Sequence, residues 1–314
     1  MRFKKPKFWD FKKPNLLSYF LSPLTIPIRI NNYFLSKKIK KRFGNIKTIC
    51  IGNIYIGGTG KTPTTLKIYK FLNELKINVC IGKKFYPSHF DEKIILEKKS
   101  KLIYSKSRLD IINKAIETNQ NLVIFDDGLQ DKNISYNLEF VCFDSENWIG
   151  NGHLIPSGPL REKVSSLKKY DAVFLKSNNQ VQKEIIDIIK IINPNIEIFE
   201  TFYEILNIKN YDTSDNYLIF SGIGNPNNFK NTLIRYNFNI KEEMIFPDHY
   251  NFKRKDIEKI KQRAKEINAK IITTEKDYVR ISKSETNDIN FVEVELKIKD
   301  KSKLIDFIKL KINE

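Results

Sequence analysis

The feature that most constrains this chain is a glycine-rich run that follows the apolar segment Ile49–Ile51 and reads Gly57-Gly58-Thr59-Gly60-Lys61-Thr62. Glycines let backbone N–H groups approach an anion without a Cβ atom in the way. The helix that such a loop opens offers its positive N-terminal end to phosphate. We expect Lys61 to reach the β- and γ-phosphates of a nucleotide, and the Thr62 hydroxyl to hold Mg²⁺. The run therefore predicts a phosphate-binding loop between a strand and a helix.

This loop departs from the common P-loop pattern, in which a glycine stands five residues before Gly60. That position is Tyr55 here, and the nearest upstream glycine is Gly52. We include Tyr55 and Ile56 with the glycine-rich run in the predicted nucleotide-binding loop. The loop is thus a variant, and the rest of the chain must indicate which kind of nucleotide-binding protein it belongs to.

Length and composition suit a globular protein with two domains. The chain has 314 residues, of which 41% are hydrophobic and 29% charged, so each half can bury a core. The cysteines and histidines are few and dispersed, without metal-ligand spacing, which argues against a zinc site. The three cysteines lie in apolar runs, as buried reduced thiols of a cytosolic protein do.

The N-terminal region, which we delimit as residues 1–40, is basic and apolar. The chain carries a net charge of +18, and no acidic residue stands between Asp10 and Glu74. Such a field of one sign suits anionic lipid or nucleic acid. Pro23 and Pro27 interrupt an apolar stretch that is too short to span a bilayer, and no signal-peptide cleavage site follows it.

Large apolar and aromatic side chains beside clustered lysines and arginines favour a segment that lies in a membrane interface. We therefore expect an anionic membrane surface, and no nucleic acid, as a partner. The alternative is a helix that packs on the domain core and turns a basic face to water.

From residue 46 onward, strand and helix patterns alternate. Continuous apolar runs such as Leu122–Phe125 and Ala172–Leu175 suit parallel strands that are buried on both faces. The alternation predicts an α/β fold with a doubly wound, mostly parallel sheet of the P-loop NTPase type over 41–205. We expect Ile196–Ile205 to be an extended connector, and 206–314 to form a second, smaller α/β domain in which Phe291–Leu296 is one strand.

Acidic residues close one of the apolar runs. Asp126 and Asp127 follow Leu122–Phe125, and carboxylates at the end of a strand beside a phosphate loop can complete a Mg²⁺ shell. Ligands bind at this edge of open α/β sheets. The alternative is a solvated Asp-Gly turn.

Three further segments carry candidate chemistry but leave alternatives open. The loop 151–162 ends in Arg161 and Glu162, and the arginine could bind phosphate with its planar fork. His249 follows Asp248, as either a general-base pair or a histidine tied down in the core. Asp91 and its neighbour Glu92 read by themselves as the acidic start of a helix.

Together these segments resemble the tetraacyldisaccharide 4′-kinases, the lipid A 4′-kinases of Gram-negative bacteria. The matching segments run in order along the chain: Gly52-Asn53 with Gly57–Pro63, Asp126-Asp127-Gly128-Leu129-Gln130, Gly150-Asn151-Gly152 through Gly158-Pro159-Leu160-Arg161-Glu162, Phe220–Pro226, Asp248-His249 and Thr273–Asp277. The basic, apolar N-terminus is also similar to the membrane-associating segment of that family. In place of the family's Ser-Arg-Gly-Tyr, this chain has Gly82-Lys83-Lys84-Phe85-Tyr86.

The resemblance implies a reaction and roles for particular residues. Such kinases move the γ-phosphoryl group of ATP to the 4′-hydroxyl of a tetraacylated glucosamine disaccharide 1-phosphate. By this resemblance Lys61 and Thr62 bind phosphates and Mg²⁺, which Asp126 and Asp127 organise. Asp91 accepts the proton of the sugar hydroxyl.

In the same way, His249 swings in from the second domain to tune Asp91, while Arg161 and Glu162 support the nucleotide site. The resemblance also implies a peripheral location at the cytoplasmic face of the bacterial inner membrane. The rival interpretation is a P-loop ATPase of the partitioning or maturation type that acts as a switch on the membrane surface. Such ATPases usually carry a lysine before the two glycines, where this chain has Ile56.

Overall fold

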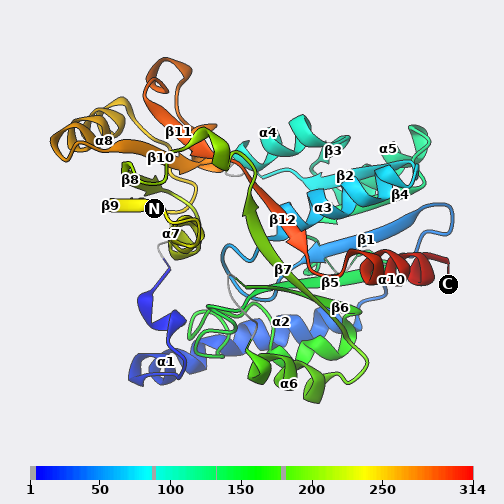
Figure 1. Ribbon diagram of the computed structural model, residues 1–314. Helices are drawn as coiled ribbons and strands as arrows, with labels where there is room; N and C mark the ends of the chain where they lie inside the picture. Colours follow the sequence, from blue (N-terminus) through cyan, green and yellow to red (C-terminus); the bar gives the residue numbers. More distant parts are fainter. Residues whose placement is uncertain (1–4, 87–89, 132, 178–181, 314) are drawn as a thin grey trace. The chain divides into compact units, whose positions relative to one another are not determined.

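The computed structural model describes residues 5–86, 90–131, 133–177 and 182–313 (Figure 1). The chain forms two compact units, which we describe separately. The larger unit comprises Lys5–Phe85, Lys99–Phe202 and Ile298–Glu314, and the smaller unit comprises Tyr86–Lys98 and Tyr203–Lys297. The sequence suggested continuous domains over 41–205 and 206–314. The observed units differ from these because 86–98 joins the smaller unit and the C-terminal helix joins the larger one.

An eight-stranded sheet has the strand order β12-β7-β6-β5-β1-β4-β2-β3. The bounds of its strands are β1 Lys47–Gly52, β2 Val79–Lys84, β3 Leu102–Ser105, β4 Leu122–Asp126, β5 Leu138–Asp144, β6 Ala172–Lys176, β7 Glu197–Ile205 and β12 Val294–Ile298. The neighbours from β7 to β3 pair in parallel. The predicted doubly wound α/β fold is therefore confirmed, but Ile196–Ile205 is largely a strand of the sheet and not a connector.

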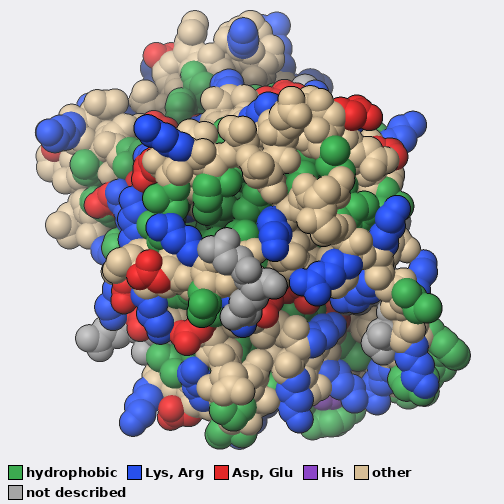
Figure 2. Space-filling model, turned by 90° about the vertical axis from the view of Figure 1, so that its right-hand side faces the viewer, with side chains coloured by type: hydrophobic (Ala, Val, Ile, Leu, Met, Phe, Trp, Pro, Cys, Tyr) green, Lys and Arg blue, Asp and Glu red, His purple; other side chains and the backbone are tan. Residues whose placement is uncertain are grey.

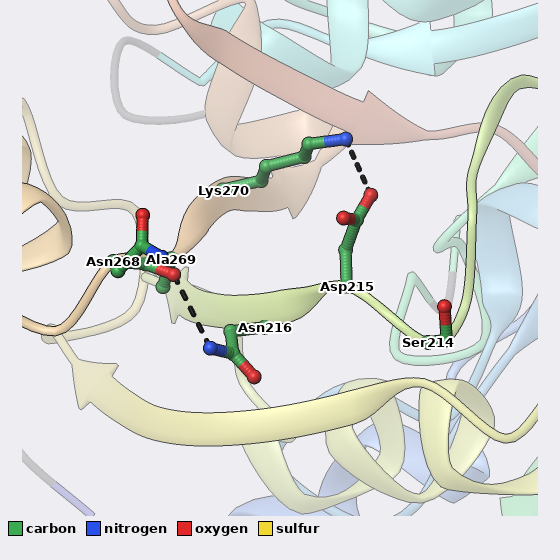
Figure 3. A pocket seen from close by; sticks show the side chains of 6 residues that line it. All are labelled: Ser214, Asp215, Asn216, Asn268, Ala269 and Lys270. Carbon is green, nitrogen blue, oxygen red and sulfur yellow. Dashed lines mark hydrogen bonds and ion pairs between the residues drawn. The ribbon is translucent and has the colours of Figure 1, made fainter.

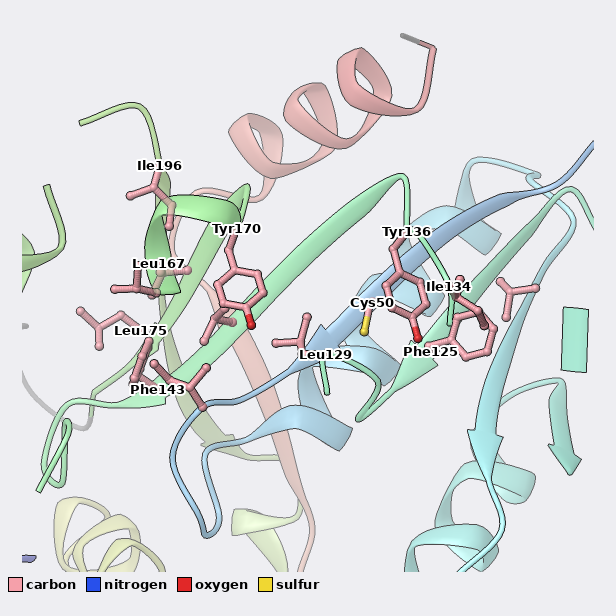
Figure 4. Close-up of a cluster of buried hydrophobic side chains, with 14 of the residues drawn as sticks. Cys50, Phe125, Leu129, Ile134, Tyr136, Phe143, Leu167, Tyr170, Leu175 and Ile196 are labelled. Carbon is pink, nitrogen blue, oxygen red and sulfur yellow. The ribbon is translucent and has the colours of Figure 1, made fainter. Parts of the chain in front are cut away.

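Helices cover both faces of this sheet in the larger unit, because alternate residues of each strand point to opposite sides. On one face, Ile49 and Ile51 of β1 pack in a cluster with α3 (Lys61–Glu74) and α10 (Lys301–Asn313). On the other face, Cys50 belongs to a cluster with α5 (Arg108–Glu117) and α6 (Lys183–Ile192). Figure 4 shows part of the second cluster, including Cys50, Phe125 and Tyr170. The apolar face of α10 explains why the C-terminal helix belongs to this unit.

The smaller unit has a four-stranded parallel sheet in the order β11-β10-β8-β9. Its strands are β8 Asn216–Ser221, β9 Asn239–Ile245, β10 Lys270–Thr274 and β11 Ile289–Val292, and its helices are α4 Phe90–Lys99, α7 Pro226–Arg235, α8 Arg254–Glu266 and α9 Glu275–Tyr278. α7 packs on one face of the sheet and α8 on the other. The predicted single strand Phe291–Leu296 was wrong, because the chain leaves β11 at Val292 and enters β12 at Val294.

The N-terminal segment of the larger unit consists of short helices: α1 Leu16–Leu21 and α2 Ile26–Lys37, with the 3₁₀ turns Lys7–Asp10 and Ser22–Thr25. Trp9 is buried, and its indole Nε1–H donates to the Pro156 carbonyl at 3.0 Å. Asn151 Nδ2 donates to Ser18 Oγ at 2.9 Å, and Asn32 Nδ2 donates to the Arg161 carbonyl at 3.0 Å. Polar contacts thus fasten this segment to the loop 150–161.

Candidate functional site

The predicted phosphate loop lies between β1 and α3 and is held from behind by a buried amide. Asn53 Nδ2 donates to Thr59 Oγ1 at 3.0 Å and to the Gly57 carbonyl at 3.3 Å. Gly60 has φ 85° and caps α3 in the left-handed region, which glycine adopts without a Cβ penalty. The shape of the loop is therefore supported by contacts within the chain itself. Asn53 was not among the predicted site residues, although it stands at the end of the apolar strand run.

Asp126 ends β4 directly beside the phosphate loop. Thr62 Oγ1 donates to Asp126 Oδ2 at 3.0 Å, as the prediction of a shared site requires. The Nζ atom of Lys83, at the end of β2, lies 2.5 Å from the same oxygen, and both side chains are buried. Sequence reasoning did not assign Lys83 a role. Its signal was the pair Lys83-Lys84, which follows the apolar residues Val79–Ile81 in the same strand.

Thr62 and Asp126 offer a hydroxyl and a carboxylate, the hard oxygen ligands that Mg²⁺ prefers. Within the parts of the chain that the structure describes, no group of three His, Cys, Asp or Glu side chains is arranged to hold a metal ion. Mg²⁺ usually keeps several waters and takes its other ligands from one or two side chains and from substrate phosphates. The residues present therefore fit a nucleotide-bound Mg²⁺ and not a cage made of protein ligands.

Asp127 forms ion pairs with two of the predicted site residues. Lys61 Nζ lies 3.8 Å from Asp127 Oδ2, and Arg161 Nη1 lies 3.4 Å from Asp127 Oδ1. Arg161 Nη1 also donates to Gln130 Oε1 at 3.1 Å. The Asp127 backbone has φ 63°, an uncommon conformation for a residue other than glycine. Both cations lie beside the phosphate loop, where an entering phosphate could draw them away from this carboxylate.

The other predicted nucleotide-binding residues have structural partners. Glu162 accepts from Tyr170 OH at 3.2 Å and from Lys169 Nζ at 2.5 Å. The Tyr55 side chain is buried and its hydroxyl donates to Asp10 at 2.5 Å, while the Ile56 N–H donates to the Pro159 carbonyl at 2.9 Å. The Ile56 contact connects the phosphate loop to the loop that carries Arg161. Direct nucleotide contacts of Tyr55 and Ile56 stay a prediction.

A second cluster lies in the smaller unit and is centred on Asp91, at the start of α4. His249 Nδ1 lies 3.3 Å from Asp91 Oδ1, whereas Arg280 Nη2 lies 2.6 Å and Lys276 Nζ 3.4 Å from Asp91 Oδ2. The structure brings Asp91 and His249 together within one unit, so no movement between domains is needed for their contact. Arg280 was missed because no motif marks it.

The charges around Asp91 determine its ionisation. Burial by itself would raise the pKa of this carboxyl, but the hydrogen bond with His249 and the positive charges of Lys276 and Arg280 outweigh burial. They hold the pKa of Asp91 well below its usual range. A carboxylate with a low pKa is ionised at neutral pH and free to accept a proton, although it is a weak base.

A polar pocket of about 360 Å³ lies elsewhere in the smaller unit (Figure 3). It is lined by Ser214, Asp215, Asn216, Asn268, Ala269 and Lys270, with Lys270 paired to Asp215 and Asn216 bound to the Asn268 carbonyl. Asn216 and Lys270 begin β8 and β10, so the pocket is at the amino ends of these strands. None of the predicted site residues lines this pocket, because the turns that carry the sequence motifs follow the carboxyl ends of the strands.

Comparison with known proteins identifies the family. The model of the tetraacyldisaccharide-1-P 4′-kinase family matches residues 17–100 and 83–313. A tetraacyldisaccharide 4′-kinase of Pelagibacter ubique is 46% identical over 316 residues, covering 100% of this chain and 99% of that protein. Another from Rickettsia conorii is 34% identical over 310 residues, covering 93% of this chain and 94% of that protein.

A solved structure supports the same fold. The crystal structure of LpxK from Aquifex aeolicus in complex with ATP superimposes with a TM-score of 0.67 at 21% identity, covering 95% of this chain and 100% of that one. The resemblance inferred from the motifs is confirmed, and the rival interpretation as a partitioning-type ATPase is not favoured. This chain belongs to the tetraacyldisaccharide-1-P 4′-kinase family.

Proposed function

We propose that this chain transfers the γ-phosphoryl group of ATP to the 4′-hydroxyl of a tetraacylated glucosamine disaccharide 1-phosphate, a step of lipid A biosynthesis. The observation that carries the proposal is the pairing of a formed phosphate loop, in which Thr62 contacts Asp126, with a separate carboxylate, Asp91, that is ionised and bound to His249. Family membership and relatives that are named tetraacyldisaccharide 4′-kinases identify the substrate class.

The roles follow from the chemistry of phosphoryl transfer. Asp91 takes the proton of the 4′-hydroxyl while the 4′-oxygen of the sugar attacks the γ-phosphorus. The bond between the γ-phosphorus and the β–γ bridging oxygen breaks, and ADP leaves. Lys61 stabilises the charge that develops on the transferring group. Thr62 and Asp126 would hold Mg²⁺, which when bound neutralises charge on the phosphates.

Arg161 and Asp127 border the same loop, and the arginine fork suits phosphate oxygens. Asp127 would then release Lys61 and Arg161 to the nucleotide when it binds. His249 orients Asp91 through the contact between its Nδ1 atom and the carboxylate.

We also propose that the N-terminal segment lies on an anionic membrane surface, at the cytoplasmic face of the bacterial inner membrane. Its polar side chains Ser18 and Thr25 are buried, whereas Leu16, Phe20 and Ile39 are 89%, 79% and 94% exposed. A segment that leaves several large apolar side chains exposed beside exposed lysines suits an interface with lipid. Within the described chain, no helix is long and apolar enough to cross a membrane.

The net positive charge of the chain, +18, favours attraction to an anionic membrane surface. On the face drawn in Figure 2, blue lysine and arginine side chains spread widely among the red acidic ones. Each basic residue near an anionic leaflet contributes about 1 kcal/mol of attraction, which salt screens. Lipid anchoring therefore needs the exposed apolar side chains as well as the charge.

The decisive experiment incubates the wild-type protein with radiolabelled ATP, Mg²⁺ and the tetraacylated disaccharide 1-phosphate, and separates the lipid products by chromatography. We expect a lipid product that carries one more phosphate, and ATP consumption that depends on the lipid acceptor. Lys61→Ala should lower turnover at least ~100-fold, the effect of removing one preorganised electrostatic group. The exposed-site variant Lys114→Ala is the matched control.

Two results would overturn the proposal. Equal ATP hydrolysis with and without the lipid would favour the switch-type ATPase. Near-normal lipid phosphorylation by folded Lys61→Ala protein would remove the phosphate loop from the mechanism.

A further inference from the structure

Arg280 is the most extensively bound cation of the smaller unit's Asp91 cluster. Its side chain is 6% exposed, and those of Asp91 and Asp277 are 3% and 0% exposed. Nη2 lies 2.6 Å from Asp91 Oδ2, while Nη1 lies 2.8 Å from Asp277 Oδ1 and donates to the Gly222 carbonyl at 2.7 Å. One guanidinium therefore connects α4, the turn after β8 and the segment around α9.

The inner half of this guanidinium is fixed in place. Asp277 Oδ2 accepts from the Gly222 N–H at 3.0 Å and from Thr274 Oγ1 at 2.8 Å, so the carboxylate that holds Nη1 is itself immobilised. The planar fork transmits that orientation to Nη2, because the two nitrogens cannot rotate independently. Nη2 is thereby aimed at Asp91.

The two oxygens of Asp91 have different surroundings. Oδ2 is occupied by Arg280 and, at 3.4 Å, by Lys276. Among the described residues, the partner of Oδ1 is His249 Nδ1 at 3.3 Å. A proton delivered to Asp91 has less competition at Oδ1, because two cationic groups already bind Oδ2.

The His249 Nδ1 atom lies within hydrogen-bond distance of both Asp91 and Arg280. This atom lies 3.3 Å from Asp91 Oδ1 and 3.2 Å from Arg280 Nη2. When protonated, Nδ1 can donate to Asp91, and when unprotonated it can only accept from Arg280. The position of Arg280 thus affects both the carboxylate and the imidazole that orients it.

We propose that Arg280 is a positioning residue for the phosphoryl transfer, one that binds Oδ2 of Asp91 and so commits Oδ1 to accepting the substrate proton. This inference rests on the proposed function, since it deepens the role assigned to Asp91. Lys276 cannot replace the arginine fully, because its ammonium lies farther from Oδ2 and also binds Glu92 at 2.8 Å.

Charged groups from three parts of the smaller unit surround Asp91 and affect its ionisation. From α4, the turn 248–249 and the α9 segment, these groups are Glu92, Asp248, His249, Lys276, Asp277 and Arg280. Arg280 favours the ionised carboxylate, so its removal raises the pKa of Asp91. An opposite charge at this distance lowers a carboxyl pKa by roughly 1–3 units, and the remaining cation Lys276 keeps part of that effect.

The test compares wild-type protein with Arg280→Met, Arg280→Lys and the exposed control Arg254→Gln, which loses an arginine on the surface of α8. For each we measure the pH profile of kcat with saturating lipid acceptor, and KM for ATP. We expect Arg280→Met to move the acidic limb to higher pH by about one unit and to lower kcat by ~10–100-fold. KM for ATP should change less than twofold, and Arg280→Lys should recover part of kcat.

A second readout does not depend on catalysis. Carbon-13 NMR of labelled aspartate carboxyls, with the Asp91 signal assigned from Asp91→Asn, should show the Asp91 titration midpoint rising in Arg280→Met. If the methionine variant does not fold, Arg280→Gln keeps a hydrogen-bond donor at this position without the positive charge, and should raise the midpoint as well. An unshifted Asp91 midpoint in a folded variant would overturn the inference. A wild-type protein inactive on the lipid would instead overturn the proposed function, while the NMR result stays interpretable.

Discussion

The Nζ atom of Lys83 lies 2.5 Å from Asp126 Oδ2, with both side chains almost completely buried. The same carboxylate oxygen accepts from Thr62 at 3.0 Å. Burying an ion pair is costly, and it is maintained only when geometry and extra hydrogen bonds offset the loss of hydration. Lys83 and Thr62 thus hold the Asp126 side chain in place at the edge of the sheet where a nucleotide is proposed to bind.

Lys83→Met should destabilise the protein by about 3–5 kcal/mol, because the remaining Asp126 charge would be buried without a partner. Denaturant unfolding measures the loss. The double variant Lys83→Met with Asp126→Asn should recover part of the stability, since the uncompensated charge is then removed as well.

The control for this prediction is Lys114→Met, which removes an exposed lysine from α5; a change within about 0.5 kcal/mol is expected there. If Lys83→Met were as harmless as the control, the buried pair would not stabilise the larger unit.

Asp91→Asn should lower kcat by roughly 10²–10⁴, the range for removing a general base, with little change in nucleotide affinity. His249→Ala should cost less, because it orients Asp91 and does not accept the proton itself. The two changes combined should be non-additive, as expected for side chains 3.3 Å apart that act as a unit. Steady-state kinetics of the four proteins measures the coupling, and strictly additive losses would separate the two roles.

Membrane binding should depend on the exposed apolar side of the N-terminal segment. Replacing Leu16, Phe20 and Phe34 with serine should weaken co-sedimentation with anionic vesicles and leave a salt-sensitive remainder from the basic residues. This variant is preferable to deleting 1–35, because a deletion would also remove Trp9, which is buried against the loop 150–161.

The matched control replaces exposed apolar residues elsewhere in the larger unit, Ile191 on α6 and Leu310 on α10. Wild-type vesicle binding by the N-terminal variant would assign the membrane contact to another surface. Lipid phosphorylation should fall more than nucleotide binding in the N-terminal variant.

The cysteines should resist alkylation at pH 8 in the native state. Burial raises the pKa of Cys80 and of Cys142 to about 12 from 9.0, so both stay protonated and poorly nucleophilic. Their raised pKa values contribute stability that is fully present below pH 9 and is lost as the pH rises toward 12. Iodoacetamide labelling with mass spectrometry checks this, and rapid labelling of folded protein at pH 8 would contradict it.

Strands made of continuous apolar runs were predictable from the sequence, whereas β3, β7 and β9 were not recognised as strands. β4 and β6 are continuous apolar runs because helices bury both faces of the sheet. β3 and β9 lie at sheet edges, and β9 mixes Lys and Glu with its apolar residues. An edge strand needs fewer apolar residues, so its pattern is weak.

Motifs likewise indicated which residues could form the site but not all the contacts within it. Thr62 and Asp126 were expected together because parallel strands place their carboxyl ends at one edge. Arg280 and Lys83 meet their carboxylates across 189 and 43 residues of sequence. Such long-range partners depend on how elements pack, which no local pattern records.

The position of Trp9 determines what intrinsic tryptophan fluorescence of this protein can report. The chain contains two tryptophans, Trp9 and Trp148, and both belong to the larger unit. Trp9 belongs to the N-terminal segment and is buried against the loop 150–161, while Trp148 packs against Phe143 with ring centroids 4.6 Å apart. Intrinsic tryptophan emission will therefore follow the larger unit, including detachment of its N-terminal segment. Melting of the smaller unit, which holds Asp91 and Arg280, calls for an optical probe placed there by design.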